Sequence, residues 1–244
     1  MIKRLICIPI YLFSIGSVFY TLFIQDWLGL LYALISLLLY ALVEKGTEKI
    51  QLVLSDLLKI ILHIFIFFAV VLGSIYGFYT YFSWWDSLLH GTTGFLCAAV
   101  GLSLANLFGI EMNKAPLFKF LVALFFSMTV GIFWEFYEFS VDRLLVMNVQ
   151  KDTLVNTVTT NFIYDESLEN PQTMNNIEKI VIYHDDDHVT TIEGGMLDIG
   201  LFDTIKDQAV HLAGTSIFFI LCIFFKKQSL TTKLMITKKS KKNN

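Results

Sequence analysis

The chain has 244 residues, of which 55% are hydrophobic, 15% aromatic and only 16% charged, and its mean hydropathy is +0.64. Soluble domains carry about 25% charged residues, so this composition indicates an integral membrane protein and excludes a disordered chain, a collagen and a secreted disulfide scaffold. The net charge of −3 combines 18 basic and 21 acidic residues, and the sequence has no broad basic surface that would bind nucleic acid.

Six apolar runs are long enough to cross a bilayer, for which a helix needs about 20 residues. They predict an all-α polytopic membrane protein with transmembrane helices at 5–24, 27–43, 57–81, 86–110, 115–139 and 207–225. The first run begins with Lys3 and Arg4 as a signal peptide would, but no small-residue cleavage site follows it. We therefore interpret it as a membrane anchor.

The chain divides into four predicted parts. Helices one to five occupy 1–139, an acidic extracytoplasmic loop or lid occupies 140–206, the sixth helix occupies 207–225, and a basic cytoplasmic tail occupies 226–244.

Lysine and arginine residues lie in every other connection between the predicted helices. They flank the start of the first helix and occur in the 44–59 connection, the 111–119 turn and the C-terminal tail, but not in the 82–86 turn. By the positive-inside rule, both termini are cytoplasmic and the 140–206 segment lies outside. We predict a multi-pass protein of the bacterial cytoplasmic (plasma) membrane.

The outer segment is strongly acidic. Between Asp142 and Phe202, eleven acids face three basic residues, which gives a net charge of −8. Strand-like runs at 153–164, 179–183 and 189–192, separated by turn residues, predict a small β-rich lid or hairpin. The His-Asp-Asp-Asp-His run at 184–188 could collect a divalent cation, but Asp-rich hairpin turns are common, and we interpret it as a solvated turn.

Ionisable residues follow one face of each of three predicted helices. The fourth helix carries Asp86 and His90, the fifth Glu135, Glu138 and Asp142, and the sixth Asp203, Asp207 and His211. The predicted topology places all three stripes in the outer leaflet. An ionisable side chain in hydrocarbon costs at least about 2.5–3.5 kcal/mol, so such groups normally face the bundle interior and find partners.

Six acids and two histidines cannot neutralise one another by ion pairing, and only Arg143 and Lys206 are nearby cations. Either some carboxyls are protonated or a divalent cation sits among them. Carboxylates with imidazole suit Mg²⁺, Mn²⁺, Fe²⁺ or Zn²⁺, and no thiolate lies at this level. The candidate metal ligands are Asp86, His90, Glu138, Asp203, Asp207 and His211, and the candidate catalytic residues are Glu135 and Glu138.

A simpler alternative is a capped, water-filled interfacial pocket. Ser83-x-x-Asp86 has the form of a capping box, Asp203 could cap the sixth helix, and Trp84 and Trp85 suit an interfacial aromatic belt. This alternative leaves unexplained the residues further into the helices, which are His90, Glu135, Glu138, Asp207 and His211.

The motifs resemble those of a known family. Residues 85–95, Trp-Asp-Ser-Leu-Leu-His-Gly-Thr-Thr-Gly-Phe, resemble the aromatic-Asp-x-x-x-His-x-x-x-Gly-Phe motif of the YjdF-like bacterial inner-membrane proteins, a family of unknown function. Residues 133–138 and 200–207 resemble its Glu-x-x-Glu and Asp-Thr-x-x-Asp segments, and a looser similarity to VanZ-like membrane proteins rests on the same order of motifs.

The resemblance covers about half of the chain and implies the six-helix fold and the site, but no reaction. The acidic 140–206 segment is an insertion relative to the compact family pattern. His211 stands where related sequences tend to have a less basic residue such as Asn.

Three classes of function remain open. The first is a metal-dependent hydrolase or transferase acting on a lipid-linked or envelope substrate, with Glu135 or Glu138 as general base and His90 or His211 as ligand or acid. The second is a cation or proton transporter or sensor, against which the cytoplasmic half shows no polar set apart from His63. The third is a non-catalytic structural or partner-binding protein.

The predicted partners are the lipid bilayer and a lipid or envelope substrate, without nucleic acid, and the oligomeric state is left open. His63 is interpreted as an interhelical hydrogen-bonder.

Overall fold

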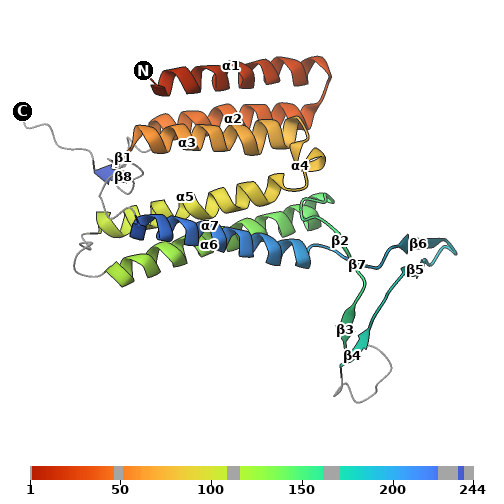
Figure 1. The fold of residues 1–244 in the computed structure, drawn as a ribbon. Coiled ribbons are helices and arrows are strands. Elements are labelled where there is room, and N and C mark those ends of the chain that lie inside the picture. The colour runs from red at the N-terminus through yellow and green to blue at the C-terminus, as the bar shows by residue number, and fades with distance from the viewer. Residues whose placement is uncertain (1, 47–51, 109–115, 162–170, 225–235, 239–244) are drawn as a thin grey trace, which may run out of the picture. The chain divides into compact units, whose positions relative to one another are not determined.

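The protein is described from a computed structural model, which covers residues 2–46, 52–108, 116–161, 171–224 and 236–238 (Figure 1). It forms two compact units, Met1–Ile132 with Gln208–Asn244 and Phe133–Asp207, and the division falls inside two helices. Six helices in the described residues are long and apolar enough to cross a membrane. The prediction of an all-α, multi-pass membrane protein is confirmed.

In the first unit, helices α1 (Ile2–Phe23), α2 (Trp27–Lys45) and α3 (Asp56–Ile66) pack side by side (Figure 1). The Asp26 side chain accepts a hydrogen bond from the Gly29 amide and caps α2, and Ser55 caps α3 by accepting from the Leu58 amide. These caps satisfy amide groups that the first turn of a helix leaves without partners. Both helices therefore begin at a capped residue.

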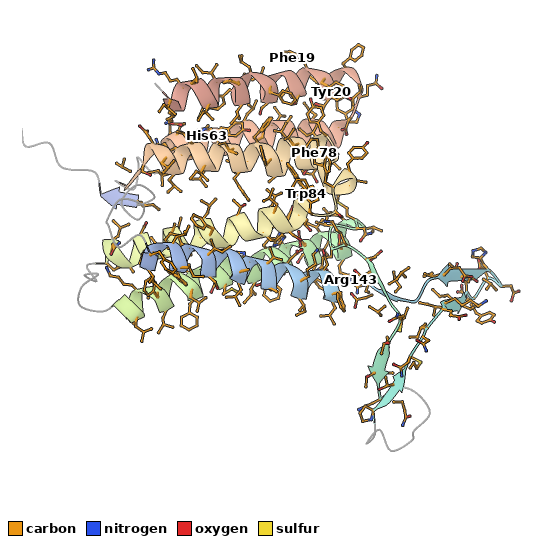
Figure 2. All side chains as sticks on the ribbon, viewed as in Figure 1. Phe19, Tyr20, His63, Phe78, Trp84 and Arg143 are labelled. Carbon is orange, nitrogen blue, oxygen red and sulfur yellow. The ribbon has the colours of Figure 1, made fainter. Side chains whose placement is uncertain are left out.

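Helix α1 has a polar interior face and an apolar exterior face. Ser14, Ser17 and Thr21 are fully buried at helical spacing, whereas Leu12 and Phe19 are exposed (Figure 2). In water this arrangement would be unfavourable, but in lipid the apolar face is solvated and small hydroxyl side chains pack and bond between helices. The pattern supports a lipid-facing surface on this helix.

The third predicted span, 57–81, is interrupted. Helix α3 continues as a π-helix, η1 (Phe67–Ile75), and then stops, because Gly77 adopts the left-handed φ of 72° that glycine tolerates best. A short helix, α4 (Phe78–Tyr81), follows. The apolar composition of the run predicted its membrane location but gave no signal for the π-helix.

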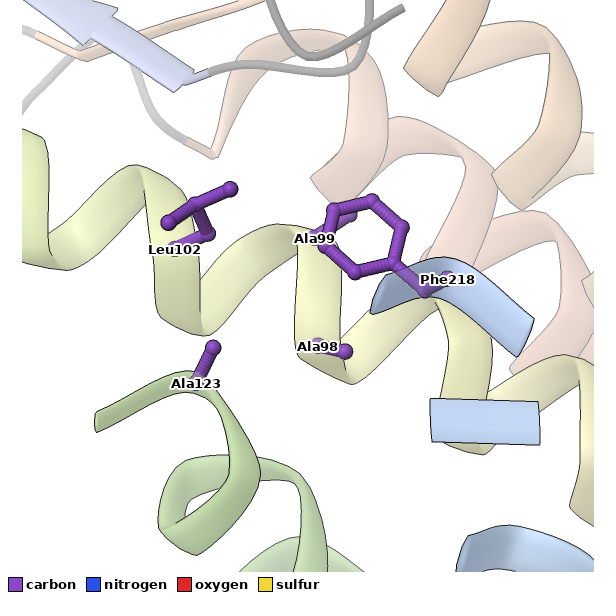
Figure 3. Packing of buried hydrophobic residues seen from close by; sticks show 5 residues of the cluster. All are labelled: Ala98, Ala99, Leu102, Ala123 and Phe218. Atoms are coloured by element: carbon purple, nitrogen blue, oxygen red, sulfur yellow. The ribbon is translucent and has the colours of Figure 1, made fainter. Parts of the chain in front are cut away.

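Helices α5 (Trp85–Leu107), α6 (Pro116–Leu145) and α7 (Leu201–Phe224) provide the second part of this unit's core. Ala98, Ala99 and Leu102 of α5 are buried with Ala123 of α6 and Phe218 of α7 (Figure 3). The small side chains permit close packing. A Cβ atom added at Gly94 would lie 2.0 Å from the His211 carbonyl oxygen, and one at Gly214 would lie 1.9 Å from the Gly91 carbonyl oxygen.

The C-terminal region contributes one short strand. Strand β1 (Leu52–Leu54) pairs in antiparallel register with β8 (Ile236–Lys238). The rest of the predicted basic tail, 226–244, lies outside the described residues.

The second unit consists of the end of α6, six short strands and the start of α7. Strands β2 (Thr153–Val155) and β7 (Met196–Asp198), β3 (Val158–Thr160) and β4 (Gln172–Met174), and β5 (Lys179–Tyr183) and β6 (Val189–Glu193) form antiparallel pairs. The predicted β-rich segment is confirmed, although residues 162–170 are not described. The 184–188 turn joins β5 to β6, with the His184 amide donating to the His188 carbonyl.

The helices that border this segment are longer than predicted. Helix α6 extends past 139 to Leu145, and α7 begins at Leu201 and not at 207. The reason for the early start of α7 is local, since the Asp198 carboxylate accepts hydrogen bonds from the Gly200 and Phe202 amides and initiates the helix.

Candidate metal centre

The first-unit part of the candidate site begins on α5. Asp86 and His90 are four residues apart on one helix face, both are buried, and Asp86 Oδ1 lies 3.6 Å from His90 Nε2. Helical geometry brings side chains at this spacing together, as the sequence predicted. A buried carboxylate and a buried imidazole are thus held within reach of one another by a single rigid element.

His211 of α7 is also buried, and its contacts are with hydroxyl and carbonyl groups. Its Nε2 atom lies 3.0 Å from Ser127 Oγ and 2.9 Å from the Ser127 carbonyl oxygen. Because a carbonyl only accepts, Nε2 carries the hydrogen, and in the neutral ring the lone pair is on Nδ1. The Ser127 hydroxyl also bonds Thr215 Oγ1 at 2.8 Å, and both hydroxyls lie near the Gly94 carbonyl.

In the second unit, the carboxylates of Glu135, Glu138 and Asp207 are buried. The Trp134 indole nitrogen donates a 2.8 Å hydrogen bond to Glu138 Oε1 from one turn earlier on α6. Asp207 Oδ1 lies 3.6 Å from the Lys206 ammonium nitrogen, which is partly exposed. These partners orient two of the acids without removing their ability to hold a cation.

Two further acids of the predicted stripes hold the loop after α6. Asp142 accepts hydrogen bonds from the backbone amides of Val149 and Gln150. Asp203 accepts from the Lys151 amide at 2.9 Å and from the Lys206 ammonium at 3.3 Å. Asp142 therefore holds the segment that follows α6 to the end of α6, and Asp203 holds it to the first turn of α7.

Buried side chains that could hold a metal ion occur in both units. In the first unit they are Asp86 and His90, and in the second unit they are Glu135, Glu138 and Asp207. Asp203 and His211, which the sequence also predicted as ligands, are not among them.

The alternative of a capped, water-filled interfacial pocket is not supported at the start of α5. The residue that precedes α5 in the N-cap position is Trp84, which makes no side-chain capping bond, so Ser83 and Asp86 do not form a capping box. Trp85 is buried and stacks on Phe68 with 5.2 Å between ring centroids, whereas Trp84 is exposed. Only Trp84 of this pair suits an interfacial belt.

Sequence reasoning missed Ser127 and Thr215, although the stripes contained a signal for both. Thr215 continues the 203, 207, 211 series by one more helical turn, and Ser127 lies one turn before Gly131, which itself precedes Glu135 by a turn. Small hydroxyl residues were not counted because they are common in transmembrane helices. Both are buried beside His211, so the polar stripes of α6 and α7 extend further along these helices than the sequence predicted.

Comparison with known proteins gives one match. The family model described as predicted membrane protein (DUF2238) matches residues 2–228. No curated protein and no solved structure matches the chain. This match spans nearly the whole chain and is consistent with the YjdF-like resemblance, whereas the similarity to VanZ-like proteins is not shown.

Proposed function

The chain belongs to the DUF2238 family of predicted membrane proteins, and we propose that it is a membrane-embedded, divalent-cation-dependent hydrolase or transferase acting on a lipid-linked or cell-envelope substrate. The observation that carries the proposal is the burial of potential metal ligands in both units, with the Asp86–His90 pair in the first and three carboxylates in the second. In this proposal Asp86, His90 and Asp207 hold the cation. Glu135 and Glu138 complete the site on its reactive side.

A cation is the most economical way to stabilise these side chains. Five carboxylates are buried on the three helices: those of Asp86, Glu135, Glu138, Asp203 and Asp207. Ionised carboxylates withdrawn from water require ion pairing, hydrogen bonds or metal coordination. Oxygen ligands with one imidazole favour Mg²⁺, Mn²⁺, Fe²⁺ or Zn²⁺ over soft metals.

The same residues supply the chemistry of a hydrolase or transferase. A bound divalent cation polarises a phosphoryl or carbonyl oxygen and makes water more acidic. Glu135 and Glu138 are the candidate general bases, and the Trp134 hydrogen bond fixes the orientation of Glu138. A general base must lie within hydrogen-bond reach of the water or hydroxyl that it deprotonates, so the proposal requires the substrate or water to bind beside these carboxylates.

The substrate class follows from charge and surroundings. The segment from Asp142 to Phe202 carries a net charge of −8, which disfavours soluble anionic substrates. The helices expose many large apolar side chains, including Phe133 and Phe136 of α6, to the surrounding lipid. A substrate with a lipid anchor would reach the site from the bilayer, and we place the site in the outer leaflet with both termini cytoplasmic.

Metal content is the first test of this proposal. The protein is purified in detergent, loaded with Mn²⁺ or Zn²⁺, and its bound metal is measured by elemental analysis. We expect stoichiometric metal in the native chain, loss in His90→Ala, and retention in the matched control His184→Ala, which changes an exposed histidine of the β5–β6 turn. Native protein that is folded but holds no metal after loading would overturn the proposal.

Turnover is the second test. The loaded protein is assayed with a polyprenyl diphosphate and with a phospholipid, beside Glu135→Gln. We expect release of the headgroup by the native chain and a loss of at least about 100-fold in the variant, because general acid–base catalysis contributes 10²–10⁴-fold. Metal binding with no turnover, together with cation flux in proteoliposomes that His90→Ala abolishes, would instead establish transport.

The orientation has a separate test. A cysteine at Asp186, in the exposed turn between β5 and β6, is introduced into a chain whose Cys7, Cys97 and Cys222 are replaced by alanine. We expect labelling by a membrane-impermeant thiol reagent on intact cells. Labelling only after the cells are permeabilised would place this segment in the cytoplasm.

A further inference from the structure

A second polar network lies within the first unit, where α1 and α3 begin and α2 ends. It contains Lys3 and Tyr11 of α1, Tyr40 and Glu44 of α2, and Lys59 and His63 of α3. Figure 2 labels His63 on α3. His63 is fully buried at the centre of this network. The sequence predicted only an interhelical hydrogen bond for His63 and gave no second polar set, so the other members of the network are a finding of the structure.

The hydrogen bonds of His63 determine which of its ring nitrogens carries the hydrogen when the ring is neutral. Its Nδ1 atom lies 2.6 Å from the Lys59 carbonyl oxygen, which can only accept, so Nδ1 carries the hydrogen. Its Nε2 atom lies 2.6 Å from the Tyr11 hydroxyl. In the neutral ring Nε2 accepts from that hydroxyl, and both nitrogens are satisfied. The predicted interhelical hydrogen bond, from α1 to α3, is confirmed.

Glu44 provides a hydrogen-bond partner for the protonated state of His63. Its Oε2 atom pairs with the Lys3 ammonium at 2.7 Å and the Lys59 ammonium at 3.3 Å. Its Oε1 atom is buried, accepts no hydrogen bond from the described residues, and lies 3.7 Å from His63 Nε2. A hydrogen on Nε2 would therefore meet a carboxylate oxygen that has an unused acceptor site.

We infer that His63 is a proton-binding site whose Nε2 atom exchanges partners, accepting from Tyr11 when the ring is neutral and donating to Glu44 when the ring is protonated. The exchange moves one hydrogen bond of α3 from α1 to α2. The inference is independent of the proposed metal centre, because it uses none of the residues of that centre.

The other groups around His63 decide whether protonation is favourable. Lys3 and Lys59 oppose a third cation, but both are paired with Glu44, and Lys3 also lies 3.9 Å from Asp56 Oδ1. The Tyr40 ring stacks on the imidazole with centroids 5.2 Å apart and planes 7° apart, which places the face of an aromatic ring against the cation. Cys7 of α1 is also buried, and its thiol is only a weak hydrogen-bond donor.

A route for the proton is also present. The side chains of Glu44 and Lys3 are about a quarter exposed, at 27% and 25%, whereas His63 is not exposed at all. A proton from the aqueous phase can therefore reach Glu44 first and pass to Nε2 over the 3.7 Å separation. The ligand of this site is the proton itself.

The test is the titration of His63 followed by NMR of the full-length protein with ¹⁵N-labelled histidine in detergent. His63→Gln assigns the signal. We expect a titration that Glu44→Gln moves to lower pH by about one unit or more, which is about a tenfold loss in proton affinity, because a neighbouring carboxylate favours the charged ring. Asp56→Asn is the matched control, since it removes a negative charge from an exposed side chain of α3 and should leave the midpoint nearly unchanged.

Tyr11→Phe gives an independent arm that preserves the ring and the fold. Removing the hydroxyl that donates to Nε2 takes away a bond of the neutral state, so the midpoint should move to higher pH, opposite to the effect of Glu44→Gln. A His63 signal that stays neutral from pH 4 to pH 9, or that shifts equally in Glu44→Gln and Asp56→Asn, would overturn the inference.

Discussion

The protein has two buried polar regions, one around His63 and one on α5, α6 and α7, and they differ in how their charges are balanced. Around His63, two lysines face Glu44 and Asp56, and each ring nitrogen of the histidine has a partner. On α5, α6 and α7, the five buried carboxylates outnumber the three lysine and arginine side chains. The first region is balanced by its own residues. The excess of carboxylates in the second region supports our proposal that it binds a cation from solution.

The largest expected effect comes from the packing that supports the His90 region. In Gly94→Ala, the new Cβ would lie 2.0 Å from the His211 carbonyl oxygen, a backbone atom that cannot move without displacing α7. We expect destabilisation of about 3 kcal/mol or more. Thermal unfolding in detergent measures it.

The control for this substitution is Gly16→Ala on α1. No heavy atom lies within 4 Å of a Cβ at that position, and alanine is the better helix former, so the unfolding temperature should stay the same or rise slightly. Equal destabilisation by both substitutions would contradict the close packing of α5 against α7. The comparison of the two regions would then lose its structural basis.

The next largest effect distinguishes a proposed metal ligand of α7 from a residue of the same helix that hydrogen-bonds the loop after α6. Asp207 is a proposed metal ligand, whereas Asp203 accepts a hydrogen bond from the Lys151 amide. We expect Asp207→Asn to weaken Mn²⁺ or Zn²⁺ binding by at least about 100-fold, since losing a ligand should cost more than the 10–100-fold of an outer-shell change. Asp203→Asn should leave metal affinity within about tenfold of native. Calorimetric titration measures both, and the reverse order would reassign the ligands.

A smaller effect is expected at the hydroxyls next to His211. Ser127→Ala removes a hydroxyl that contacts His211 Nε2, Thr215 Oγ1 and the Gly94 carbonyl. The buried partners would keep only their other bonds, so we expect a loss of about 1–2 kcal/mol in stability. Metal content should be unchanged, because His211 is not among the proposed metal ligands. Loss of metal in this variant would return His211 to the ligand set.

The sequence was sufficient for the features that depend on periodicity and composition. Apolar runs predicted six membrane helices, and alternating strand-like runs predicted the β-rich segment. The four-residue spacing of Asp86 and His90 predicted their contact, because helix geometry alone determines it. That Asp203 accepts a hydrogen bond from the loop after α6 could not be predicted, since its Lys151 partner is distant in sequence. The His63 network was missed for the same reason, because Tyr11 and Glu44 come from other helices and look unremarkable by themselves.

The smallest expected effect tests whether the His63 network depends on the stacking of the Tyr40 ring or on the Tyr40 hydroxyl. Tyr40→Phe keeps the ring on the imidazole and removes only the 3.2 Å contact with Ser14 Oγ. Hydrogen bonds between membrane helices contribute about 0.6 kcal/mol on average, so the unfolding temperature should fall slightly. The His63 titration midpoint should not move, because neither Tyr11 nor Glu44 is altered. A midpoint shift as large as that of Glu44→Gln would show that the Tyr40 hydroxyl, and not the carboxylate, controls proton binding.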